Sequence, residues 1–591
     1  MPTRHTGTAP SRLRRGTVAA IAVAVTATGA LAVAGRADAA AGCRVTYSVT
    51  SQWPGGFGAT IDVTNLGAPL SDWTLKFSFS AGQTVTQLWN GVVNQSGSNV
   101  TVINAEYNGN LGTNATVTPG FNGSWTGSNP APTAFTLNGT ACTGSTTPTT
   151  APPTTAPPTT APPTTPPPTG DSTKARVIAM TDGEVDDRST MIRFLMYASD
   201  FDIAGIVQTN SKYQKSGHSR DKWVEAQLTK YAEILPNLRR HNPNYPDASQ
   251  LQSVLRVGNE NSNDLNVAPP SMATKNTPGE QLIINVLLDS DPRPVHVMAW
   301  GGANTLASAL WRLRTSYSSA DFNRAVAKVR IYCIWYQDGG GQWIEDNVRE
   351  AYINEAYRWD NVWDYQSLSG PSPDYVKAYM TSSWLNTNVK SGHGPLGSMY
   401  PQSFVSEGDT PSFLHEIANG LNAHEDYTLG GWGGRSAYDD PGNKPRHLTD
   451  TTISDDGDRN KMYWRWIPAV QNDFAARMDW AVSSSYNGAN HQPKAEVVGA
   501  SRRDVSPGQV ISLDASPSTD PDGNVLTYRW WQYGDADSVA AKVSINNATS
   551  QNAANFVVPN EPGKQVHIIL EVADNGTPNL TSYRRLIFTI R

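Results

Sequence analysis

Residues 175–198, ARVIAMTDGEVDDRSTMIRFLMYA, run from an apolar segment through a dense acidic stretch into a helical pattern. Four acidic side chains fall within the eight positions from Met180 to Asp187. The apolar segment predicts a buried β-strand, and the residues from about Arg188 onward predict a helix. We therefore expect the acidic stretch at the carboxyl end of a strand, directly before a helix.

The same alternation of strand and helix continues toward the C-terminus. Apolar, β-rich runs occur at 201–209, 293–300 and 328–336, and helical stretches such as 221–235 and 303–317 fall between them. Alternation of this kind is typical of a mainly parallel sheet covered by helices. We predict an α/β domain over residues 173–490.

Two regions of different character precede this domain, and one follows it. Residues 43–142 contain short alternating strands separated by Gly, Asn and Ser, which predicts a β-sandwich. Residues 143–172 repeat Ala-Pro-Pro-Thr-Thr, a composition that favours an extended polyproline spacer. In residues 491–591 strand patterns return, which predicts a second, immunoglobulin-like β-sandwich. The predicted fold class is therefore multidomain.

The N-terminus has the pattern of a secretory signal peptide, residues 1–39. An apolar stretch from about 18 to 33 is too short to span a membrane and ends near the small residues Ala37-Asp38-Ala39; it follows Arg4, Arg12, Arg14 and Arg15. We expect an extracellular protein. The Arg14-Arg15 pair suggests export by the twin-arginine route, but the residues after it favour the general secretion route.

The net charge of −6 predicts neither a nucleic-acid partner nor, once the signal peptide is removed, a membrane partner. The 18 Trp and 22 Tyr point toward carbohydrate, because aromatic faces stack on sugar rings, although large cores also use Trp. Of three cysteines, Cys43 and Cys142 bracket the first predicted sandwich, and we pair them in a disulfide. Cys333 lies in an apolar run and is expected to be a buried free thiol.

The first sandwich resembles the family 2 carbohydrate-binding modules of bacterial cellulases and xylanases. The resemblance rests on the flanking cysteines, DWTLKFSF, VTQLWNGVVNQSGSNVTVINAEYNG and the closing PGFNGSW…APTAFTLNGTAC. It implies an exposed aromatic row of Trp53, Trp89 and Tyr107, with Tyr107 in place of the usual Trp, and a buried Trp73. The alternative is that Trp53 and Trp89 belong to the core. Cellulose is the expected ligand, with chitin or xylan as alternatives.

The acidic stretch has two interpretations when it is considered by itself. Asp182, Asp186 and Asp187 stand where ligands bind in open parallel sheets, and adjacent carboxylates repel unless a cation lies between them. Oxygen ligands suit calcium or magnesium, and no His/Cys cluster at zinc spacing occurs in the sequence. Alternatively, Asp186 and Asp187 only stabilise the N-terminus of the following helix.

The acidic loop and three later segments resemble the inosine–uridine type of nucleoside hydrolases. The segments are GIVQTN, AWGGANTLASAL and SEGDTPSFLHEI. The resemblance implies a calcium ion held by Asp182, Asp187, the carbonyl of Asn304, and Asp409. It also implies that Asp182 is the general base and that substrate is bound by Asp186 and Asn210.

Other positions depart from that family. Its histidine before the last aspartate is Gly408 here, and its Glu-Phe-Asn block is absent; a glycine-rich loop with Asp338, Gln342 and Trp343 stands in the equivalent region. The stretch GGWGGRSAYDD adds Trp432 and Arg435 among glycines. We expect Trp343, Trp432 and Arg435 to contact a rebuilt sugar pocket, with a purely structural turn at 432–435 as the alternative.

Residues 174–591 as a whole resemble a bacterial family that joins a nucleoside-hydrolase-like domain to a C-terminal immunoglobulin-like domain and is described as cellulose-binding. The resemblance is carried by TDGEVDDRSTMIRFL, EGDTPSFL, GGWGGRSAY and QNDFAARMDWAV. The first hypothesis is a secreted, calcium-dependent glycoside hydrolase of plant cell wall carbohydrate, acting in polysaccharide catabolism. The alternatives are a non-catalytic cellulose-binding protein and an extracellular nucleoside hydrolase.

Overall fold

The computed structural model describes residues 42–53, 55–105, 108–146, 174–363 and 372–591. The predicted signal peptide and nearly all of the predicted linker lie outside these residues. The chain divides into two compact units, Met1–Thr159 and Thr160–Arg591, and each is described by itself. Within the described residues, no helix is both long and apolar enough to cross a membrane.

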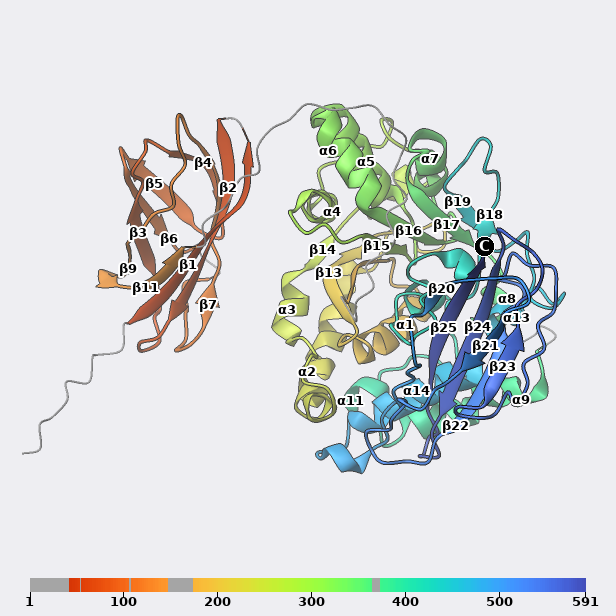
Figure 1. Cartoon of the computed structure of the whole chain (residues 1–591). Coiled ribbons are helices and arrows are strands. Elements are labelled where there is room, and N and C mark those ends of the chain that lie inside the picture. Colours follow the sequence, from red (N-terminus) through yellow and green to blue (C-terminus); the bar gives the residue numbers. More distant parts are fainter. Residues whose placement is uncertain (1–41, 54, 106–107, 147–173, 364–371) are drawn as a thin grey trace, which may run out of the picture. The chain divides into compact units, whose positions relative to one another are not determined.

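The first unit is a β-sandwich of two sheets (Figure 1). One sheet has the order β11 (Thr143–Thr146), β1 (Cys43–Trp53), β2 (Gly56–Asn65), β8 (Gly120–Ser124) and β4 (Thr84–Trp89), with β7 (Thr116–Val117) beside β2. The other has the order β10 (Thr140–Ala141), β9 (Phe135–Leu137), β3 (Thr74–Ser78), β6 (Asn99–Ile103) and β5 (Val92–Ser96). Because β11 pairs with β1, the sandwich extends four residues into the predicted linker.

The core of this sandwich has the composition that the strand pattern predicted. Trp73 is fully buried between the sheets, where its indole N–H donates to the Asn108 carbonyl at 2.9 Å. Cys43 and Cys142 form a disulfide, as predicted from the sequence. The bond links β1, at the start of the described sandwich, to the segment between β10 and β11.

An eight-stranded sheet forms the centre of the second unit, and all its strands are parallel except the last. Its order is β14 (Leu255–Val257), β13 (Phe201–Gln208), β12 (Ala175–Thr181), β15 (Val295–Ala299), β16 (Val329–Ile334), β17 (Tyr352–Ala356), β19 (His447–Thr449) and β18 (Ala437–Tyr438). The strand order reverses direction between β12 and β15. Ligands of open α/β sheets bind at such a switch point.

Helices cover both faces of this sheet (Figure 1). Alternate residues of β12 pack on opposite sides: Val177 and Ala179 join one core cluster, Ile178 and Met180 the other. The first cluster includes residues of α1 (Val185–Met196), α2 (Trp223–His241), α12 (Pro411–Leu414), α13 (Lys461–Trp464) and α14 (Ile467–Trp480). The second includes residues of α4 (Pro278–Leu288), α5 (Asn304–Ser316), α6 (Ser319–Lys328) and α7 (Gly339–Asn347). Shorter helices are α3 (Ala248–Ser253), α8 (Asp360–Trp363), α9 (Asp374–Lys377), α10 (Ser382–Leu385) and α11 (Gly394–Gly397).

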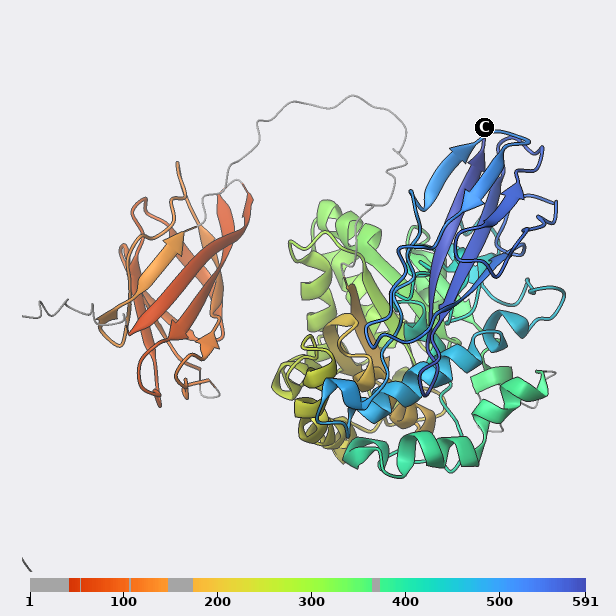
Figure 2. The same ribbon diagram turned by 60° about the horizontal axis from the view of Figure 1, so that its bottom comes forward.

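The C-terminal domain is built of strands and packs directly on the α/β domain. One sheet has the order β20 (Arg502–Val505), β25 (Thr581–Ile590), β24 (Gln565–Ala573) and β22 (Thr527–Gln532), and β21 (Val510–Leu513) pairs with β23 (Ala554–Val557). Its Tyr533, Ile569 and Tyr583 belong to the same core cluster as α1 and α14. Figure 2 shows α14 running beside these strands, and Asn472 of α14 donates to the Asn579 carbonyl at 3.0 Å.

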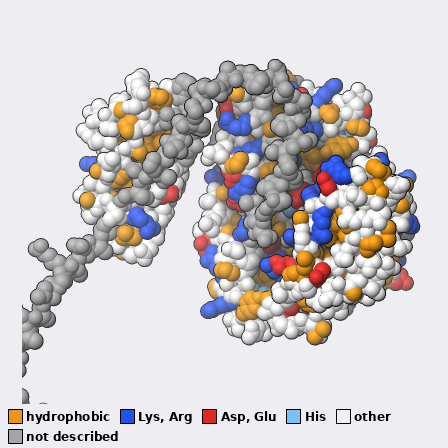
Figure 3. Space-filling view, viewed as in Figure 1, with side chains coloured by type: hydrophobic (Ala, Val, Ile, Leu, Met, Phe, Trp, Pro, Cys, Tyr) orange, Lys and Arg blue, Asp and Glu red, His pale blue; other side chains and the backbone are white. Residues whose placement is uncertain are grey.

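The predicted fold class is confirmed: a β-sandwich, a mainly parallel α/β domain and a C-terminal β domain. On the face of the second unit drawn in Figure 3, basic and acidic side chains are interspersed among neutral ones.

Candidate functional site

The acidic loop folds its carboxylates inward at the end of β12. Gly183 adopts a left-handed φ of 77°, which turns the chain sharply into α1. Asp187 accepts hydrogen bonds from the Thr181 hydroxyl and from the Asp182 N–H, the latter at 3.1 Å. Asp182 Oδ1 accepts from the Glu184 N–H, also at 3.1 Å. Local bonds therefore fix the loop, and Asp182 and Asp187 are each 2% exposed.

A fourth carboxylate reaches this loop from a segment more than two hundred residues away in sequence. One carboxylate oxygen from each of Asp186, Asp187 and Asp409 lies within 4.8 Å of the other two, and all three residues are buried. Among the described residues, Asp182 Oδ2 and Asp409 Oδ2 are buried without a hydrogen-bond partner. Buried oxygen atoms of this kind normally have a partner, so they point to a ligand.

The electrostatics of the cluster favour a cation. Burial raises the pKa of Asp187 well above its usual range, and the carboxylates of Asp182 and Asp186 raise it further. Burial raises the pKa of Asp409 as well, and the carboxylates of Asp187, Asp186 and Asp182 raise it further. A divalent cation would stabilise the ionised forms, and a set of carboxylate oxygens is the donor chemistry of calcium. The residues therefore fit the predicted ion.

Two asparagines, Asn210 and Asn304, follow β13 and β15, the strands on either side of β12, at the same edge of the sheet. Asn210 follows β13, is fully buried and accepts at its backbone carbonyl from the Gly302 N–H at 2.9 Å. Asn304 begins α5, where its side-chain amide donates to the Asp264 carbonyl at 2.7 Å. The side-chain oxygens of both asparagines are buried without a hydrogen-bond partner in the described part of the chain. The role of the Asn304 carbonyl as a metal ligand stays a prediction.

Asp338, which the sequence analysis placed in a glycine-rich loop without giving it a role, is also a member of this site. It follows β16, and its carboxylate accepts from the Asn304 N–H at 2.9 Å and from the Gly340 N–H at 2.7 Å. Burial raises the pKa of Asp338 to about 6, and the charge of Asp182 contributes. A Cβ at Gly302 would lie 2.1 Å from Asp338 Oδ2, so only glycine permits this approach. The available signal was an aspartate directly after a predicted strand.

A buried ion pair braces the loop that carries Asp409. Arg193 of α1 and Glu407 are both fully buried and form a charged pair. Arg193 also donates to Gln471 of α14 at 2.6 Å, and the Thr410 hydroxyl donates to Glu407 at 2.9 Å. The brace connects the Asp409 loop to the helix that follows the acidic loop.

An aromatic group beside the carboxylates was also missed. Trp335, directly after β16, has a left-handed φ of 60°, a rare conformation for a bulky residue that marks functional sites. Its ring centroid lies 5.1 Å from that of Trp359, 6.3 Å from Tyr357 and 6.5 Å from Tyr213. Tyr213 and Tyr357 are 50% and 38% exposed, so the group reaches the surface.

Three residues predicted to bind substrate do not join this site. Trp343 lies on α7 and packs against the core cluster that contains α5. Trp432 is 2% exposed, and its ring packs against Tyr583 of the C-terminal domain at 6.3 Å. Arg435 donates to Asp455 at 2.8 Å. This geometry favours the alternative interpretation of 432–435 as a structural turn, because contact between two domains buries Trp432.

The predicted aromatic row of the first sandwich is described only in part. Trp89 ends β4 with 42% of its surface exposed. A Cβ at Gly120, its partner on β8, would lie 2.4 Å from the indole nitrogen, so the ring lies over bare backbone. Trp53 ends β1, but its side chain and the whole of Tyr107 lie outside the described residues.

Three family models match the chain. The model for the nucleoside hydrolase-like domain of cellulose-binding Sde182 matches residues 176–436, and the cellulose binding domain model matches residues 43–142. The model for the C-terminal domain of cellulose-binding protein Sde0182 matches residues 510–590. The chain thus carries a cellulose-binding domain of family 2.

Curated relatives match over a limited part of their length. Endoglucanase CelA of Streptomyces lividans is 51% identical over 132 residues, which are 22% of this chain and 29% of that enzyme. Chitinase C of the same organism is 38% identical over 130 residues, which are 22% of this chain and 20% of that enzyme. The activities of these enzymes are therefore not assigned to this chain.

A solved structure covers the second unit. It is a nucleoside hydrolase-related hypothetical protein from Saccharophagus degradans, described as associated with carbohydrate metabolism. It is 34% identical, the match covers 71% of this chain and 100% of that one, and the TM-score is 0.61. This chain therefore belongs to the family of cellulose-binding proteins with a nucleoside hydrolase-like domain, and it carries a family 2 cellulose-binding domain in addition.

Proposed function

We propose that residues 174–591 form a calcium-dependent glycoside hydrolase that acts on plant cell wall carbohydrate outside the cell. The observation that carries the proposal is the convergence of Asp186, Asp187 and Asp409 at the switch point of the sheet. Asp182 is bonded to Asp187 through its N–H, and Asp182 and Asp409 each have one buried oxygen without a partner among the described residues. The family 2 module would hold the enzyme on cellulose.

The residues suit hydrolysis of a glycosidic bond. Asp182, Asp187, the Asn304 carbonyl and Asp409 would hold the ion, which supplies positive charge that keeps these carboxylates ionised and orients sugar hydroxyls. Asp182 Oδ2 is the general base that takes a proton from the attacking water. Attack on the anomeric carbon then inverts its configuration. Asp186 and Asn210 contact the sugar.

The aromatic group supports a carbohydrate substrate. Trp359 lies next to Asp186 across Gly408, and Trp335 packs against Trp359, so aromatic rings on which a sugar can stack stand near the carboxylates. Burial raises the pKa of Asp338 to about 6. It is the residue best suited to donate a proton to the leaving oxygen, a role that needs a carboxyl group with a raised pKa.

One observation favours a non-catalytic cellulose-binding protein as second candidate. The nucleoside enzymes that this domain resembles carry a histidine for the leaving group, and Gly408 stands in its place. A Cβ at Gly408 would lie 2.6 Å from Asp186 Oδ2 and 2.6 Å from a Trp359 ring carbon, so no side chain fits there.

Sugar release by the full chain from wall polysaccharides, oligosaccharides and nucleosides, with and without a chelator, separates the candidates. We expect release from a carbohydrate that stops with chelator and in Asp182→Asn. Asp374→Asn is the matched control, because that side chain is fully exposed. Bound calcium without release from any substrate would leave only the binding protein, and release from nucleosides alone would identify a nucleoside hydrolase.

A further inference from the structure

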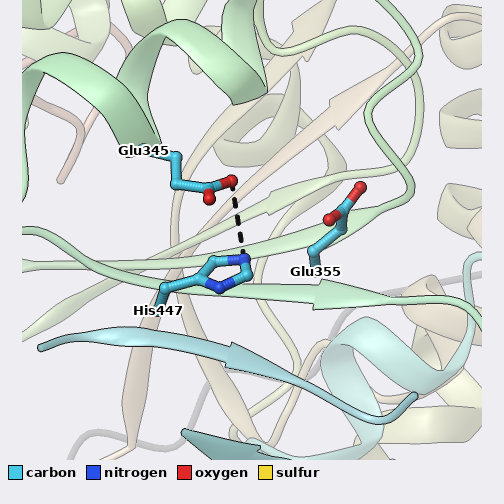
Figure 4. Close-up of side chains that lie close together, drawn as sticks. All are labelled: Glu345, Glu355 and His447. Atoms are coloured by element: carbon cyan, nitrogen blue, oxygen red, sulfur yellow. Dashed lines mark ion pairs between the residues drawn. The ribbon is translucent and has the colours of Figure 1, made fainter. Parts of the chain in front are cut away.

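A second cluster of ligating side chains shares no residue with the carboxylates of the acidic loop. Glu345 of α7, Glu355 of β17 and His447 of β19 each place one ligand atom within 4.8 Å of the other two (Figure 4). All three are buried, with 5%, 8% and 6% of their surface exposed. The three come from one helix and two strands, so their convergence depends on the fold.

The register of the sheet explains why they meet. His447 pairs with Ile353 in the parallel pairing of β17 and β19, and Glu355 is two residues beyond Ile353. Side chains two residues apart on a strand lie on the same face, so Glu355 and His447 share a face of the sheet. Ile353 belongs to the core cluster that contains Ile344 of α7, which places Glu345 over the same face.

His447 is the side chain that points to a ligand. Neither of its ring nitrogens has a hydrogen-bond partner in the described part of the chain. A neutral imidazole keeps a free lone pair on one ring nitrogen, which is the atom that binds a metal ion. Nε2 lies 3.6 Å from Glu345 Oε2, and Nδ1 lies 3.7 Å from Asp439 Oδ2.

The distances from the His447 ring nitrogens to the two carboxylates suit a bound metal ion better than a direct hydrogen bond. A distance of 3.6 Å is too long for a hydrogen bond. Two ligands of a tetrahedral zinc ion lie roughly 3.4 Å apart, because each is about 2.0–2.1 Å from the metal. A carboxylate beside the far nitrogen of a ligating histidine is a common partner in zinc sites, and Asp439 stands in that place.

Both glutamates are held by partners through one carboxylate oxygen. Lys444 donates to Glu345 Oε1, while Glu345 Oε2 is the oxygen that faces His447. The Tyr357 hydroxyl donates to Glu355 Oε1. These contacts orient the carboxylates and partly balance their charge.

We propose that Glu345, Glu355 and His447 bind a divalent transition-metal ion, zinc in the first instance. One imidazole nitrogen and two carboxylate oxygens form a ligand set that zinc accepts, whereas the all-oxygen cluster at the acidic loop suits calcium. The ion would tie α7 to β17 and β19, and α7 begins next to Asp338. The proposal does not depend on hydrolase activity.

Zinc binding to the untagged full chain, stripped with chelator and then titrated with zinc chloride, tests the proposal by calorimetry and by metal analysis after gel filtration. We expect one zinc per chain and a raised melting temperature. His447→Gln and Glu345→Gln should each weaken zinc binding at least about tenfold, since even outer-sphere changes cost that much. His393→Gln, outside the cluster, should bind zinc like wild type.

Asp409→Asn distinguishes the two metal sites, because it should reduce calcium binding and leave zinc binding unchanged. Near-ultraviolet circular dichroism of every variant checks that it is folded. Cobalt in place of zinc should give visible absorption bands that His447→Gln lacks. The proposal is overturned if folded wild type takes up no zinc, or if both cluster variants bind zinc as wild type does.

Discussion

At the scale of single residues, Gly408 marks the difference between this site and the nucleoside hydrolases it resembles. The position that carries a histidine in those enzymes is closed here by Trp359 on one side and by Asp186 on the other. The Trp359 ring thus stands beside the position where those enzymes carry the histidine.

Gly408→Ala tests how tightly this position is packed. The added methyl group should destabilise the protein by about 1–3 kcal/mol, the usual cost of overpacking. It should also weaken calcium binding, because Asp186 must move and its carboxylate lies against those of Asp187 and Asp409. Urea unfolding and a calcium titration measure the two effects. Gly442→Ala is the control, since the nearest atom would be 3.6 Å away. Equal stability of the two variants would contradict the packing described here.

His415 predicts a dependence of stability on pH. It is 1% exposed, and burial lowers its pKa from 6.5 to about 4. Between these values the unfolded chain binds a proton that the folded chain does not bind. The contribution of His415 to the free energy of unfolding is therefore fully present above pH 6.5. It decreases as the pH falls toward 4, by up to roughly 3 kcal/mol.

Unfolding measured at pH 7.5 and pH 5.0 checks the expectation for His415. In His415→Phe the loss of stability on acidification should be smaller than in wild type, although His567, with its pKa lowered to about 3, contributes in the same direction. His393→Gln should keep the wild-type loss. An unchanged loss in His415→Phe would show that other groups cause it.

At the scale of elements, the pair of Arg193 on α1 and Glu407 before α12 joins the two acidic segments of the site. Both side chains are fully buried. The guanidinium group also lies 3.9 Å from the centre of the Phe474 ring on α14. Three elements therefore meet at one arginine, and the spacing between Asp409 and the acidic loop depends on it.

Glu407→Gln should destabilise the protein by about 3–5 kcal/mol, because it leaves Arg193 buried without a counter-charge. The double variant Arg193→Met/Glu407→Leu should recover much of that loss, since an apolar pair needs no charge balance. Urea unfolding measures both. Glu233→Gln, which breaks an exposed pair with Lys230, should cost less than about 1 kcal/mol. If Glu407→Gln loses no more stability than Glu233→Gln, the buried pair of Arg193 and Glu407 does not stabilise the fold.

The elements also show what the sequence could predict. The alternation of apolar and helical runs predicted the α/β domain, and the position of Asp182 after a strand predicted its place at the sheet edge. Trp335 was misread as strand because it continues the apolar run, whereas β16 ends at Ile334. The burial of Trp432 could not be predicted, because packing between domains leaves no periodic signal in the sequence. Glu345, Glu355 and His447 form no local sequence motif, because only the fold brings them together.

At the scale of the whole molecule, the C-terminal domain is part of the structure that supports the site. Arg585 of β25 is 1% exposed and donates to the carbonyls of Leu421, Leu429 and Gly430 in the α/β domain at 2.7–2.9 Å. At Gly420 a Cβ would lie 1.8 Å from the Tyr583 carbonyl. The segment that connects Asp409 to β18 is thus held by the strands of the C-terminal domain.

Arg585→Met tests this dependence. The variant leaves three buried carbonyls without their donor, and each buried unsatisfied group costs about 1–3 kcal/mol. We expect a melting temperature well below that of wild type and faster proteolysis of the 417–436 segment, with weaker calcium binding because the Asp409 loop precedes that segment. Arg529→Met, which removes an arginine whose side chain is 65% exposed, is the matched control and should behave as wild type. If Arg585→Met resists protease and binds calcium as the control does, the C-terminal domain packs against the site without supporting it.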